Sequence, residues 1–247
     1  DRVLQLATAA TYKLSGVVNG IDAEVFTPAT DPLIYANFDA NPLEKKAENK
    51  QFLQQRLGLA VRDVPMVVMI TRLVGHKGVD LVQAVMDDLM WEDLQLVVIG
   101  TGERQYENMF RAYAANFPAK MSANIVFDNT LAHQAYAGAD LVLMPSKQEP
   151  CGLTQLIAMR YGAIPIVRET GGLLDTVPAY NIETGDGNGF TFKSYNAHDM
   201  LDAVRRAVGL FGDKEHWTAL QKSVMAYDSS WKRSVQEYWD IYHSLVD

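Results

Sequence analysis

The stretch DLVLMPSKQEPCGLTQLIAMRYGAIPIVRETGG, residues 140–172, holds two apolar runs separated by a segment of helical length. The runs DLVLMPS and AIPIVR are typical of parallel strands covered on both faces. Strand, helix and strand in this order predict a parallel crossover unit. Glu149, the only cysteine (Cys151) and the pair Gly171–Gly172 lie at the ends of these elements, where polar groups need partners.

The same alternation extends over most of the chain and predicts an α/β fold, a doubly wound parallel sheet of Rossmann-like type. Residues 22–41 are expected to form a loop, because this segment is rich in proline and threonine. The expected strands are 13–20, 65–73, 94–102, 123–127, 140–146 and 163–168. The expected helices are 42–59, 77–90, 104–117, 131–139, 152–162, 197–210 and 229–247, with a short helical segment that ends near Val177.

Composition excludes several classes of protein. The formal net charge of −8 argues against a nucleic-acid-binding surface, which needs a basic footprint. One cysteine excludes an internal disulfide framework and argues against a structural zinc site. No apolar run approaches the length needed to span a bilayer, so no membrane partner is expected.

Polar residues follow five of the predicted strands. Doubly wound sheets bind ligands beyond the C-terminal ends of their strands, so these residues are the candidate site. They are Arg72, Gly100-Thr101-Gly102, Phe127, Ser146–Cys151 and Thr170-Gly171-Gly172.

Each candidate has a functional and a simpler interpretation. Arg72 and Lys77 could together neutralise a diphosphate, or form an ordinary surface pair. The loop around Gly171 could bind phosphate through backbone N–H groups, or be a plain turn. Glu149 could hydrogen-bond a sugar or stabilise positive charge at a reacting carbon, or be an acid favoured by a helix N-terminus. Phe127 could stack on a purine, or belong to the core.

Two enzyme classes are disfavoured. Cys151 has no histidine near it in the sequence, which argues against a cysteine hydrolase. The segment IGTGERQYE has two glycines but lacks the full dinucleotide-binding fingerprint, which argues against a dehydrogenase.

The motifs together resemble the bacterial glycogen synthase and plant starch synthase family of retaining two-domain (GT-B) glucosyltransferases. The resemblance covers most of the chain and is most specific at residues 146–177, SKQEPCGLTQLIAMRYGAIPIVRETGGLLDTV. The segment RLVGHKG differs mildly, since the family commonly has Gln where His76 stands. Related transferases often carry a second Glu where this chain has Ile157, so a mechanism that needs two glutamates in this motif is not expected.

The resemblance implies a role for each matched residue. Arg72 and Lys77 are expected to hold the diphosphate of a nucleotide sugar, and Glu149 to lie at the donor glucose, as the three catalytic residues. Nucleotide-sugar binding is expected at the remaining matched positions. These are Phe127 at the adenine, Cys151, Gly152 and Leu153 at the sugar, and Thr170, Gly171 and Gly172 at the phosphates.

The family's N-terminal domain, with its acceptor surface, is absent from this sequence. The resemblance therefore divides the chain into the end of an interdomain linker with a first strand (1–22), a nucleotide-sugar-binding domain (23–225) and a terminal helix directed toward the missing domain (226–247). It implies ADP-glucose, or UDP-glucose, as donor and an α-1,4-glucan as acceptor. No metal or other cofactor is expected, and the location is the bacterial cytoplasm or the plastid stroma.

Two alternatives stay open at this stage. One is a related transferase with another acceptor, which the EPCGLTQL segment disfavours. The other is an isolated nucleotide-sugar-binding module without turnover.

Overall fold

A parallel six-stranded sheet forms the centre of the computed structural model, which describes residues 14–41 and 43–245. The strands are β1 (Met66–Ile70), β2 (Gln95–Ile99), β3 (Met121–Asn124), β4 (Leu141–Met144), β5 (Ile164–Arg168) and β6 (Phe190–Phe192). Their order in the sheet is β3-β2-β1-β4-β5-β6 and every neighbouring pair is parallel, which confirms the predicted doubly wound fold.

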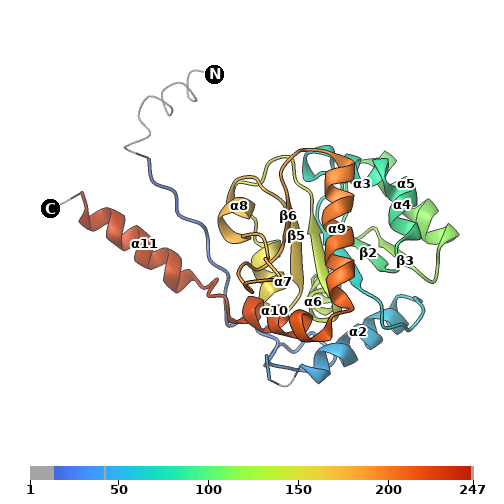
Figure 1. Cartoon of the computed structure of the whole chain (residues 1–247), viewed down its shortest axis with the longest axis horizontal. Helices are drawn as coiled ribbons and strands as arrows, with labels where there is room; N and C mark the ends of the chain where they lie inside the picture. Colours follow the sequence, from blue (N-terminus) through green and yellow to red (C-terminus); the bar gives the residue numbers. More distant parts are fainter. Residues whose placement is uncertain (1–13, 42, 246–247) are drawn as a thin grey trace, which may run out of the picture.

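Helices cover both faces of this sheet (Figure 1). Helix α3 contacts α9, α2 contacts α6, and α10 contacts both α7 and α9. The helices of the described residues are α2 (Glu44–Arg56), α3 (Val79–Ala84), α4 (Met86–Trp91), α5 (Arg104–Asn116), α6 (Asn129–Gly138), α7 (Thr154–Arg160), α8 (Gly172–Thr176), α9 (Ala197–Phe211), α10 (Lys214–Ala226) and α11 (Trp231–His243), together with the 3₁₀ turn η2 (Gly75–Lys77).

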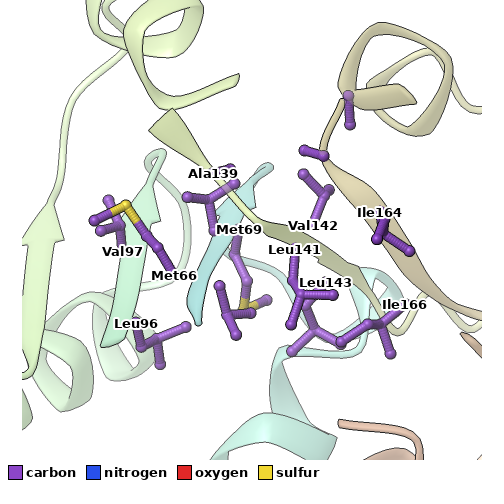
Figure 2. Packing of buried hydrophobic residues seen from close by; sticks show 14 of the residues in the cluster. Met66, Met69, Leu96, Val97, Ala139, Leu141, Val142, Leu143, Ile164 and Ile166 are labelled. Carbon is purple, nitrogen blue, oxygen red and sulfur yellow. The ribbon is translucent and has the colours of Figure 1, made fainter. Parts of the chain in front are cut away.

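The core combines the side chains of the strands with side chains of the helices that cover the sheet. Figure 2 shows Met and Leu side chains of β1 and β2 packed beside Leu, Val and Ile side chains of β4 and β5. Strands β1, β2, β4 and β5 are buried along nearly their whole length, as the continuous apolar runs indicate. This core fixes the register of β1 against β4, where Val67 pairs with Leu141 and Val68 with Val142.

Several predicted elements differ from the structure. Residues 14–20 of the predicted strand 13–20 form no strand, and Lys13 lies outside the described residues. This segment instead crosses the start of α11, where Ile21 N donates to Ser229 O (2.8 Å) and Ser234 Oγ donates to Val18 O (2.7 Å). Its apolar part, Val17–Val18, is too short to reach the core and stays half-buried.

The other differences concern boundaries. The predicted helix 77–90 is divided into α3 and α4 at Val85, whose φ of −124° is not helical. The strand predicted at 123–127 lies at Met121–Asn124, so Phe127 is in the loop beyond it. Strand β6 and helix α10 were not expected from the sequence. No helix within the described residues is long and apolar enough to cross a membrane.

Helix α2 is fastened to the sheet by buried lysines. The fully buried Lys46 ammonium donates to the carbonyls of Ala137 (3.0 Å) and Tyr161 (2.8 Å), at the C-terminal ends of α6 and α7. Lys50 forms an ion pair with Asp140 (2.6 Å), whose carboxylate also accepts from Met66 N (2.8 Å) at the start of β1. These bonds satisfy groups that would otherwise be buried without partners.

Burial gives Lys46 a pH-dependent effect on stability. Because the charged form is desolvated, the pKa of Lys46 falls from 10.5 to about 7. Between these values the unfolded chain binds more protons than the folded chain, so the contribution of Lys46 to stability rises with pH. We therefore expect the free energy of unfolding of the wild type to rise relative to that of Lys46→Met from pH 7 to pH 9. The rise should be at most about 1.4 kcal/mol per pH unit.

Urea unfolding at pH 7, 8 and 9 measures this difference. Lys45→Met removes the neighbouring exposed lysine and controls for the change in net charge. Parallel pH profiles for wild type and Lys46→Met would contradict the buried-lysine interpretation.

Candidate functional site

The candidate site lies where the order of the sheet reverses. Strands β1 and β4 are neighbours, and the chain proceeds from them toward opposite edges. Such a switch point leaves a crevice beyond the C-terminal strand ends, because the following loops diverge. Here these loops begin at Thr71 after β1 and at Pro145 after β4.

Both loops place a charged group at this crevice. Lys77, at the end of η2, and Glu149, after β4, form an ion pair with Nζ and Oε2 2.6 Å apart. The same Oε2 accepts from Ser146 Oγ (3.1 Å). The side chains retain 20% and 10% of their exposure, so the pair is largely removed from water but can still be reached from the crevice.

A cavity of about 130 Å³ opens beside this ion pair. Its lining includes Lys77, Ser146 and Glu149 together with Gly152 and the half-exposed Leu153. A cation, a carboxylate and a hydroxyl therefore converge on one small space, an arrangement that can bind a ligand with a negative group next to hydroxyls.

A second cavity, of about 210 Å³, lies beyond the ends of β1, β2 and β3. Arg72, Gly100, Thr101 and Phe127 line part of it. The Phe127 ring is 94% exposed, so it is not a core residue and presents its face to solvent. An exposed aromatic ring at the edge of an apolar cavity can stack on a flat heterocycle.

The structure separates two cations that the sequence placed together. Lys77 lines the smaller cavity and Arg72 the larger one. The Arg72 guanidinium is exposed, with Nη2 3.3 Å from Nε2 of His76. Thr71 and Ile70 line both cavities, so the two cations stand on either side of the end of β1.

The glycine loop, Thr170–Gly172, lies directly against the Glu149 turn, Glu149–Leu153. Gly172 N donates to Glu149 O (3.0 Å), so this amide is hydrogen-bonded within the chain, and phosphate binding at the loop stays a prediction. Gly171 is exposed, and its φ of +49° belongs to the left-handed region. A Cβ at Gly171 would stand 2.2 Å from Glu149 O, so the close approach needs glycine.

The remaining predicted residues lie around this contact. Thr170 is half-buried in the glycine loop. Cys151 is a half-buried free thiol whose Sγ is 3.5 Å from Gly152 O. Within the described residues, no group of three or more His, Cys, Asp or Glu side chains could hold a metal ion.

Sequence reasoning missed Tyr195, which follows β6. Its hydroxyl donates to Asp80 (2.5 Å) and lies 3.1 Å from Gly75 O, so it supports the turn that carries Lys77. Burial, together with the hydrogen bond to Asp80, raises the pKa of Tyr195 above its ordinary value, so the hydroxyl stays protonated as a donor. The tyrosine in the segment FKSYN was the only sequence signal, because β6 itself was not predicted.

Comparison with known proteins adds relatives over nearly the whole chain. The family described as glycosyl transferases group 1 matches residues 51–217. The chain is 50% identical to a glycogen synthase of Clostridioides difficile over 95% of its own length and 49% of the relative's. It is 52% identical to a glycogen synthase of Bacillus cereus over 95% of this chain and 50% of the relative. The chain thus spans about half the length of the curated relatives it matches.

Solved structures give the same result. The catalytic domain of starch synthase IV from Arabidopsis thaliana, bound to ADP and acarbose, superposes with a TM-score of 0.89 at 36% identity and covers 97% of this chain and 50% of that one. Sucrose-phosphate synthase from Thermosynechococcus elongatus matches with a TM-score of 0.66 at 17% identity, over 99% of this chain and 56% of that one. At that identity it shows the fold alone.

The close approach of the two loops predicts opposite effects for two glycine substitutions. Gly171→Ala should lower the free energy of unfolding by about 1–3 kcal/mol, because a side chain there meets Glu149 O in an unfavourable backbone conformation. Gly209→Ala, in the exposed part of α9 with nothing near its added Cβ, should be neutral or raise it by up to about 1 kcal/mol. Urea unfolding decides between these results, and equal effects of the two substitutions would contradict the packing described.

Proposed function

The chain belongs to the glycosyl transferases group 1 family, and we propose that it is the donor-binding half of a glycogen or starch synthase. It binds ADP-glucose, or UDP-glucose, and supports transfer of glucose to the non-reducing end of an α-1,4-glucan with retention of configuration. The relatives named glycogen synthase and the starch synthase structure support this assignment.

The observation that carries the proposal is the contact of Lys77 with Glu149 at the switch point. In a nucleotide sugar the leaving phosphate is bonded directly to the anomeric carbon. During transfer, negative charge grows on the phosphate while positive charge grows on that carbon. A site that stabilises both needs a cation and a carboxylate side by side, and this is the arrangement found.

Arg72 provides a second positive charge for the diphosphate from the larger cavity. Together Lys77 and Arg72 bracket the end of β1, so they can contact different phosphates of one ligand. We propose that these two cations supply the charge that a divalent ion provides in many phosphate sites, and that no metal or other cofactor is needed.

The larger cavity is the proposed nucleotide subsite. Its exposed Phe127 offers a stacking surface for the base, and the adjoining Arg72 leads to the diphosphate. The starch synthase structure bound to ADP favours adenine over uracil as the base. Glucose would then enter the smaller cavity, which Glu149, Gly152 and Leu153 line, with Cys151 adjoining them in the sequence.

The acceptor glucan requires protein outside this chain, since the relatives are about twice as long. Helix α11 is the proposed contact with that part. It projects from the body of the sheet (Figure 1) and leaves Trp231, Tyr238, Trp239 and Tyr242 between 42% and 65% exposed. Large aromatic surface of this kind marks an interaction site.

The proposed location is the bacterial cytoplasm or the plastid stroma.

A second candidate function applies to the chain when it stands alone: nucleotide-sugar binding without turnover. The position of both cations and of Glu149 on one rim favours it, because binding of the donor needs only this rim. Transfer needs an acceptor and exclusion of water, which closure over the donor supplies.

Substitution of the two cations and substitution of Glu149 should have different effects on the affinity for ADP. Arg72→Ala and Lys77→Ala should each weaken ADP binding by about 1.5–3 kcal/mol, because each removes a charge-assisted hydrogen bond. Glu149→Gln should leave ADP binding unchanged or strengthen it, because Lys77 is then released from its 2.6 Å ion pair. Calorimetric titration with ADP measures all three.

Titration with adenosine provides the internal control, since a nucleoside without phosphate should bind all variants equally. Lys147→Ala is the matched control for charge: Lys147 is exposed nearby, with its ammonium over the Tyr195 ring, and lines neither cavity. Equal losses for ADP and adenosine would contradict the proposed diphosphate clamp.

A further inference from the structure

Gln155 is a fully buried polar residue that the proposed function leaves without a role. It lies in the first turn of α7, one turn after Cys151. Its side-chain nitrogen Nε2 is 3.1 Å from Cys151 O, 2.9 Å from Gly152 O and 3.1 Å from Thr176 Oγ1. Two carbonyl acceptors on one side require an N–H donor there, so the surroundings fix the orientation of the amide.

The turn that precedes α7 is shaped to receive this side chain. Gly152 has a φ of +76°, and a Cβ on it would stand 2.4 Å from Gln155 Oε1. The Gln155 amide therefore lies against the Cα of Gly152, where only glycine leaves room. Among the described residues Oε1 has no hydrogen-bond partner, so a buried polar atom is left unsatisfied to keep this geometry.

Thr176 extends the contact to the glycine loop. Its buried hydroxyl accepts from Gln155 and donates to Gly172 O (2.6 Å). Gly172 N in turn donates to Glu149 O (3.0 Å). The hydrogen bonds form a ring that runs from the Glu149–Gly152 turn through Gln155, Thr176 and Gly172 and back to Glu149.

We propose that Gln155 and Thr176 are positioning residues that hold the Glu149–Leu153 turn and the Thr170–Gly172 loop as one rigid unit. That the Glu149–Leu153 turn faces the donor sugar rests on the proposed function, and that the Thr170–Gly172 loop faces the phosphates is the expectation from sequence. A donor then finds both of its contact loops in place and does not lose affinity to ordering them. Neither residue is expected to touch the ligand.

Because Gln155 and Thr176 belong to one ring of hydrogen bonds, substitution of either residue should affect both loops. Removal of one member leaves the next without its partner, and in a buried network such losses are not additive. Gln155→Met should therefore loosen the Gly172 loop, which Gln155 does not contact. The double variant Gln155→Met/Thr176→Val should be little worse than either single variant.

Amide hydrogen exchange in the ligand-free chain tests this coupling directly, with the Gly172 amide as reporter. We expect Gln155→Met and Thr176→Val each to raise its exchange rate roughly 2- to 12-fold, which corresponds to the loss of one net hydrogen bond. The double variant should stay in the same range, and Thr176→Ser, which keeps the hydroxyl, should match wild type. Amides in the middle of α9 report on global opening and should not change.

Gln221→Met is the matched control. Gln221 is also a buried glutamine that donates to a backbone carbonyl, Gly162 O at 3.2 Å, but it lies in α10 away from both loops. It should leave the Gly172 amide unchanged. An unchanged Gly172 rate in Gln155→Met, or additive effects in the double variant, would overturn the proposal, and Thr176→Val against Thr176→Ser decides it if Gln155→Met does not fold.

Titration with ADP-glucose and ADP connects the ring to ligand binding. Both single variants should bind ADP-glucose roughly 2- to 12-fold more weakly than wild type, again without additivity in the double variant. If wild type binds neither ligand, the proposed function fails, while the exchange measurement still decides whether the two loops are coupled. Wild-type affinity for ADP-glucose in variants whose Gly172 amide exchanges faster would overturn the positioning role.

Discussion

The contact between the Lys77 ammonium and the Glu149 carboxylate is the interaction around which this chain is arranged. Burying two charges away from water costs free energy. Their mutual attraction offsets this cost only when the protein holds them in a favourable geometry. The buried strands β1 and β4 hold the two loops at adjacent positions of one sheet edge. Ser146 and Tyr195 add hydrogen bonds that fix the carboxylate and the turn carrying the lysine. The rigid sheet thus holds the two charges in contact, which a flexible chain would not do.

Much of the fold could be predicted because most of its strands are buried on both faces. Continuous apolar runs identified β1, β2, β4 and β5 from sequence alone. The short β6 has only three residues, too few for a clear pattern. The burial of two lysines in α2 could not be predicted either, since lysines are typical of an exposed helix face. Lys46 is instead buried against backbone carbonyls, and Lys50 against Asp140. Such partners come from distant parts of the chain.

The sequence predicted which residues lie at the candidate site but not which of them are in contact. The ends of the predicted strands pointed to Arg72, Glu149 and the glycine loop, because parallel strands deliver their ends to one edge. That Lys77 contacts Glu149, 72 positions away, depends on which strands are neighbours. The same holds for Gly172, whose amide is bound by Glu149 O, and for Gln155, whose partner Thr176 belongs to another helix. The motif predicted which residues lie at the candidate site, and the packing shows which of them are in contact.

The most direct test of a donor-binding half is calorimetric titration of the wild-type chain with ADP-glucose, run beside incorporation of radiolabelled glucose into glycogen by the same preparation. The crevice beyond β1 and β4 is where the donor is proposed to bind, between the cavities that Lys77 and Arg72 line. We expect saturable binding of ADP-glucose without incorporation into glycogen. Absence of binding would contradict the assignment of the site, and incorporation at an ordinary enzymatic rate would show that the chain is a complete transferase.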